Sequence, residues 1–166
     1  LAFQGDVEEA FLDDFYKNSL KLVRISLLAG IFLYGFFSIL DAQLAPEVKG
    51  KLWFIRFAVV SPFLLSVVIL SYFHRFKKFF QPLVATAMVV AGFGIIIMIY
   101  IIPSSVRHSY YAGLILVFIW GYAFTRVRFI WATLAGWIIV AFYELVAIKY
   151  TNTPFSVLIS NNFFFI

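Results

Sequence analysis

The ionisable residues that could do chemistry in this sequence lie within or beside long apolar runs. Arg56 stands near the start of one run and Glu144 near the end of another. A charged side chain inside such a run must face the interior of a helix bundle, find a partner or extend to the interface. The pattern therefore predicts either an ion pair between Arg56 and Glu144 that fixes helix register, or a polar pocket that binds a ligand.

Other polar and aromatic residues are expected at the same depth as these two charges. The complete predicted ligand-binding cluster consists of Tyr34, Asp41, Arg56, Tyr110, Tyr111, Glu144 and Asn162. Charges combined with aromatic rings suit a ligand that has an apolar body and a polar head. The competing interpretation is that these residues only tie helices together.

Catalytic motifs are absent from the sequence, which has no glycine-rich phosphate loop, HExxH, GxSxG or kinase signature. Cysteine is also absent, and the only histidines are His74 and His108. These two are expected at opposite ends of the bundle, roughly 30 Å apart, which is too far to share a metal. No catalytic residue, metal or cofactor is therefore expected in this segment.

Composition places the chain in a membrane. Hydrophobic residues make up 64% of the 166 residues and charged residues only 13%, whereas soluble domains are about 45–50% apolar. The excess apolar surface must face lipid. The net charge of +5 arises from basic residues beside the apolar runs, which is typical of membrane topology and gives no nucleic-acid-binding stripe.

Five apolar runs approach the roughly 20 residues that a membrane helix needs. Their apolar residues are continuous and do not alternate, which favours helices over strands. The runs cover residues 25–40, 57–73, 79–102, 109–125 and 129–143, and residues 157–166 would open a sixth. We therefore predict an all-α, polytopic membrane bundle over residues 22–166, with five complete spans and a truncated sixth helix, and we expect a cytoplasmic domain, absent from this segment, to follow it.

The first 21 residues are polar and acidic. Asp6 and Glu9 resemble a capping box, and Phe11 and Phe15 share one helical face. Residues 1–21 are therefore predicted to form a separate amphipathic helix in the cytoplasm. It would either lie on the membrane surface or contact a cytoplasmic domain.

The placement of Lys and Arg predicts the orientation of the bundle. Eight of the thirteen basic residues fall on the side of the N-terminus, including those of "HRFKKF" and "TRVR". Cytoplasmic loops carry the excess of basic residues, so the N-terminus is expected in the cytoplasm. A completed sixth helix would return the chain to that side.

Long blocks of the sequence resemble a known membrane domain. These blocks are "YGFFSILD" (34–41), "LWFIRFAVVSPFLL" (52–65), "YYAGLILVFIWGYAFTRVRFIWATLAGWIIVAFYE" (110–144) and "NNFFFI" (161–166). They are similar to the N-terminal six-helix membrane domain of bacterial class III adenylate/guanylate cyclases. Similar membrane blocks also precede diguanylate cyclase and histidine kinase domains.

The resemblance implies an architecture and an activity for the whole protein. The sixth helix would continue into a linker and a cytoplasmic cyclase domain, and two chains would pair. That missing domain would convert ATP to cyclic AMP with Mg²⁺ or Mn²⁺, in a protein of the bacterial inner membrane. Every catalytic residue of the cyclase family belongs to that domain, so none transfers to this chain.

Three functions remain open from the sequence. The first is a receptor and anchor module that senses a lipophilic or periplasmic signal for a cyclase, a diguanylate cyclase or a histidine kinase. The second is a small channel or transporter subunit, against which stand the lack of internal repeats and of mid-membrane charge. The third is a structural anchor without a ligand.

The predicted orientation can be tested by cysteine labelling, because the chain has no native cysteine. Lys49→Cys should react with a membrane-impermeant maleimide in intact cells, and Lys78→Cys should react only after the membrane is opened. Labelling of Lys78→Cys in intact cells would show that the orientation is reversed.

Overall fold

The computed structural model describes residues 5–73, 76–150 and 159. This part of the chain is helical and contains no strand, which confirms the predicted all-α class. The elements in chain order are α1 (Gly5–Phe36), α2 (Ser38–Leu44), α3 (Lys49–Trp53), the π-helical segment η1 (Phe54–Val60), α4 (Ser61–Leu70), α5 (Phe76–Ile101), α6 (Arg107–Ile119), the π-helical segment η2 (Trp120–Phe124) and α7 (Phe129–Lys149).

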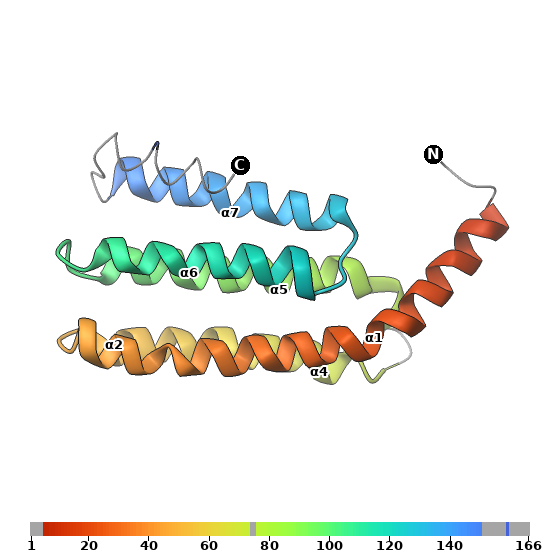
Figure 1. Ribbon diagram of the computed structural model, residues 1–166, viewed down its shortest axis with the longest axis horizontal. Helices are drawn as coiled ribbons and strands as arrows, with labels where there is room; N and C mark the ends of the chain where they lie inside the picture. Colours follow the sequence, from red (N-terminus) through yellow and green to blue (C-terminus); the bar gives the residue numbers. More distant parts are fainter. Residues whose placement is uncertain (1–4, 74–75, 151–158, 160–166) are drawn as a thin grey trace.

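The long helices run side by side as an up-and-down bundle (Figure 1). Helix α5 is central: it contacts α4 and η1 on one side and α6 and α7 on the other. The end of α4, the start of α5 and the segment between η2 and α7 lie at the end of the bundle from which α1 extends. The structure therefore places "TRVR" and the described part of "HRFKKF", which begins at Phe76, at one end.

Among the described residues, four helices are long and apolar enough to cross a membrane: Asn18–Leu44, Lys49–Leu70, Phe79–Ile101 and Phe129–Lys149. A further apolar helix, Tyr110–Phe124, is shorter. The predicted sixth helix falls almost wholly outside the described residues. Large apolar side chains such as Phe32, Phe129 and Trp137 are more than half exposed, which fits contact with lipid.

Helix α1 runs without interruption from Gly5 to Phe36 over 32 residues. The predicted boundary between residues 21 and 22 is therefore no break in the helix. The N-terminal part of α1 bends away from the bundle (Figure 1). Tyr16 joins this part to α5, because its ring lies 5.3 Å from that of Phe80 in an edge-to-face contact and 6.4 Å from that of Phe76.

The second span changes its helical form just before Pro62. A proline inside a helix lacks the N–H donor, and its ring clashes with the preceding turn. The chain relieves this by widening into the π-helical segment η1, in which Ser61 N–H donates to Arg56 O, five residues back. The wider turn carries Arg56, so the proline next to it shapes the backbone that presents the guanidinium.

Arginine side chains cap the carboxyl ends of two helices. Arg24 Nη2 donates to Ser71 O at 2.6 Å just after α4, and its guanidinium lies 3.8 Å from the Tyr72 ring centroid. Arg107 donates to Ile99 O and Ile102 O at the end of α5, each at 3.1 Å. Both place positive charge where the helix dipole and unpaired carbonyls are negative.

Gly94 is required where α5 meets α1 and η1. A Cβ at this position would lie 2.5 Å from Tyr34 Oη and 2.6 Å from Val60 Cγ2. Gly94→Ala should therefore destabilise the fold by about 1–3 kcal/mol through overpacking, measured as a lower Tm in detergent or nanodiscs.

Gly50→Ala is the matched control, since a Cβ there would meet nothing within 4 Å. Alanine favours helix over glycine, so this variant should keep or raise the Tm. Equal Tm values for the two variants would contradict the close packing at Gly94.

Candidate ligand-binding site

A buried ion pair joins the first two spans. Asp41 on α2 is 0% exposed and Arg56 on η1 is 3% exposed. Arg56 Nε donates to Asp41 Oδ2 at 2.6 Å, and Arg56 Nη2 donates to Asp41 Oδ1 at 2.9 Å. This is the two-pronged geometry in which a planar guanidinium best matches a carboxylate.

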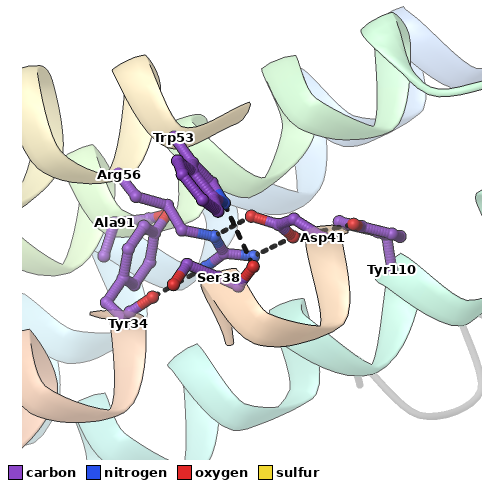
Figure 2. Close-up of polar contacts among 7 residues, drawn as sticks. All are labelled: Tyr34, Ser38, Asp41, Trp53, Arg56, Ala91 and Tyr110. Carbon is purple, nitrogen blue, oxygen red and sulfur yellow. Dashed lines mark hydrogen bonds and ion pairs between the residues drawn. The ribbon is translucent and has the colours of Figure 1, made fainter. Parts of the chain in front are cut away.

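Two tyrosines extend this ion pair to other helices. Tyr110 Oη of α6 donates to Asp41 Oδ1 at 2.7 Å, so Asp41 lies between Arg56 and Tyr110 (Figure 2). Arg56 Nη1 donates to Tyr34 O of α1 at 3.1 Å, and Tyr34 Oη donates to Ala91 O of α5 at 2.9 Å. The polar network of Tyr34, Asp41, Arg56 and Tyr110 thus connects α1, α2, η1, α5 and α6.

The network is electrically neutral as a unit. Asp41 accepts three hydrogen bonds, which removes much of the cost of burying its charge. The Tyr34 ring centroid lies 5.1 Å from Arg56 Cζ, within the range of a cation–π contact. Removing either charge would leave the other unpaired in an apolar interior, where the penalty is several kcal/mol.

An apolar cavity of about 120 Å³ adjoins the network. Tyr34, Asp41, Arg56 and Tyr110 line it, while Gly30 and Trp120 also belong to its wall. Gly30 and Asp41 are separated by eleven residues of the first span, which is ~16 Å of helix. The remaining wall is Leu33, Phe37, Leu40, Leu44, Leu64, Ala91, Ile95, Ala112, Gly113, Leu116 and Val117. The cavity is therefore an elongated apolar space with charged groups at one end.

The structure corrects the predicted pairing of Arg56 with Glu144. Arg56 pairs with Asp41, and no salt bridge joins it to Glu144 of α7. Within the described part of the chain, the buried Glu144 Oε1 has no hydrogen-bond partner. Equal depth in the membrane does not imply contact, because α5 lies between α7 and the first two spans.

The predicted cluster is therefore divided by the structure. Four of its members, Tyr34, Asp41, Arg56 and Tyr110, form the network. Tyr111 and Glu144 do not line the cavity, and Tyr111 interacts electrostatically with Tyr143 of α7. Asn162 lies outside the described residues.

Trp120 and Gly30 form a part of the site that sequence reasoning missed. Trp120 Nε1 donates to Ser26 O at 2.9 Å. A Cβ on Gly30 would lie 3.1 Å from Trp120 Cε2, so glycine lets the indole lie flat against α1. The Ser26/Gly30 small-residue pair signals close packing on α1, but nothing in the sequence pattern identifies Trp120 as its partner.

The described residues include no group of three or more His, Cys, Asp or Glu that could hold a metal. Comparisons of the chain with protein-family models, curated proteins and solved structures give no match. The arrangement itself supports binding of an amphipathic molecule, because it offers apolar walls and a hydrogen-bonding end.

The partnership of Asp41 and Arg56 can be tested by a double-mutant cycle. Asp41→Asn and Arg56→Gln should each lower stability by about 3–5 kcal/mol, since each leaves the opposite charge buried and unpaired. The double variant should lose clearly less than the sum of the two, measured by thermal or denaturant unfolding.

Glu144→Gln provides the control, combined with Arg56→Gln in a second cycle. The losses should add for this pair, because the structure gives it no direct contact. Additive losses in the Asp41 cycle, or strong coupling in the Glu144 cycle, would show that the assigned partner is wrong.

Proposed function

We propose that this chain is the membrane sensor and anchor module of a bacterial signalling protein whose cytoplasmic output is an adenylate cyclase. The observation that carries the proposal is the cavity of about 120 Å³ with the buried Asp41–Arg56–Tyr110 unit at one end. The proposal of a cyclase output rests on the sequence blocks that resemble cyclase membrane domains. ATP and Mg²⁺ or Mn²⁺ would bind only in that cytoplasmic domain.

The cavity wall belongs to several helices that a ligand could shift. Asp41 on α2, Arg56 on η1 and Tyr110 on α6 are held by the same three hydrogen bonds. A ligand can move such an assembly only if it binds two helix arrangements with different affinity. A ligand in contact with the network can bind two helix arrangements with different affinity, because a small displacement of α6 lengthens or shortens the Tyr110–Asp41 hydrogen bond.

The proposed topology has six spans in the bacterial inner membrane, with the N-terminus in the cytoplasm. The sixth span would begin within residues 157–166 and lead directly to the output domain. Helices transmit a signal over ~30 Å of membrane by tilting, rotating or sliding as rigid bodies. Pairing of two chains as a homodimer would let this motion reach a cyclase site built between them.

The proposal predicts that Tyr110→Phe changes signalling without unfolding the protein. The change removes one hydrogen bond to Asp41 and leaves the Arg56 ion pair in place. In the full-length protein, expressed in bacteria that lack their own cyclase, it should change cyclic AMP output about fivefold or more. Expression, dimerisation and Tm should be checked in parallel.

Tyr100→Phe on α5 is the matched control, because Tyr100 is exposed and does not line the cavity. It should leave the output unchanged. Unchanged output in Tyr110→Phe would favour a structural anchor. A full-length protein that makes cyclic di-GMP or phosphorylates itself, without making cyclic AMP, would refute the cyclase assignment.

A further inference from the structure

Arg56 retains hydrogen-bonding capacity at the end of the cavity. A guanidinium has five N–H donors. Arg56 uses three of them, toward the two oxygens of Asp41 and toward Tyr34 O. The other two have no partner in the described part of the chain, although Arg56 is 97% buried and lines the cavity. Buried donors without a partner favour an occupant that supplies an acceptor.

The charge of the network limits what that acceptor can be. Asp41 already neutralises Arg56, so a negatively charged head group would place a third, uncompensated charge in an apolar space. It would also approach the carboxylate of Asp41. An uncharged oxygen, such as a ketone or ester carbonyl, can accept from Arg56 without either cost.

The shape and the mouth of the cavity define the rest of the ligand. Leu33, Leu40 and Leu116 line the cavity and are 49%, 39% and 43% exposed. They belong to the apolar stretches Asn18–Leu44 and Tyr110–Phe124, so the mouth between α1–α2 and α6 opens toward hydrocarbon. The ~16 Å from Gly30 to Asp41 fits an extended alkyl chain better than a compact ring system.

We propose that the cavity binds a neutral, single-chain amphiphile that enters from the lipid side. Its carbonyl oxygen accepts a hydrogen bond from Arg56, and its alkyl chain lies between the first span and α6 toward Trp120. This inference rests on the site described under the proposed function and names its ligand class. It requires no particular output domain.

Photolabelling of the purified chain in lipid nanodiscs tests the inference. The probe is methyl undecyl ketone carrying a diazirine in its alkyl chain, with labelled residues mapped by mass spectrometry. Labels should fall on α1–α2 and α6 around Leu33 and Leu116. Unlabelled methyl undecyl ketone should compete about fivefold better than tridecane, as expected for one hydrogen bond. It should also compete better than tridecanoate at a pH where the acid is ionised.

Ala112→Phe supplies the decisive variant, because Ala112 lines the mouth without belonging to the polar network. It should abolish most of the labelling. Leu116→Phe, a smaller change at the same mouth, should reduce it in case the first variant folds poorly. Ala141→Phe, at an exposed alanine of α7 away from the cavity, should leave it unchanged.

Three results would overturn the inference. Equal competition by the ketone and tridecane would show that no hydrogen bond to the carbonyl oxygen contributes to binding. Stronger competition by tridecanoate would show that the site prefers a charged head group to a neutral one. If this mouth is not labelled, no ligand of this class binds there. That result is expected if another segment of the chain or a second copy covers the mouth. Ketone binding without cyclase activity in the full-length protein would refute only the proposed output, so the two failures are distinguishable.

Discussion

A charge buried in an apolar helix bundle must be paired, and in this protein one pair, Asp41 with Arg56, meets that requirement for two spans at once. Both side chains are almost completely buried, and their bonds continue through Tyr110 and Tyr34 to α6 and α5. In lipid the hydrophobic effect gives little reason for helices to associate. Polar contacts and close packing, such as those of Gly94 and Gly30, therefore carry much of the specificity of the bundle.

The general fold follows from the sequence because lipid imposes a simple rule. Every backbone polar group must be paired within a span, so continuous apolar runs become helices. Four predicted runs, residues 25–40, 57–73, 79–102 and 129–143, overlap helices long enough to cross a membrane. The run at 109–125 forms a shorter helix. Helical signals continue across residues 21 and 22, so the change of polarity there does not end the helix.

The candidate site was predictable in part. Asp41 and Arg56 are fifteen residues apart on either side of a short turn that contains Pro46, and that geometry brings the ends of two adjacent spans together. Depth alone suggested Glu144 instead, because sequence gives the height of a residue but not the direction in which its helix faces. The same missing rotation explains why Tyr110 joins the network while its neighbour Tyr111 does not line the cavity. For the same reason, the sequence did not identify Trp120 as the side chain that packs against Gly30.

If the Asp41–Arg56 pair holds the first two spans and α6 as one unit around the cavity, loss of the pair should loosen all three together. Amide hydrogen exchange in nanodiscs, comparing the wild type with Asp41→Asn, measures this. We expect faster exchange together in α2 (Ser38–Leu44), η1 (Phe54–Val60) and the start of α6 at Arg107, with α7 (Phe129–Lys149) unchanged. Exchange that stays unchanged in any of the first three segments, or that rises equally in α7, would contradict it.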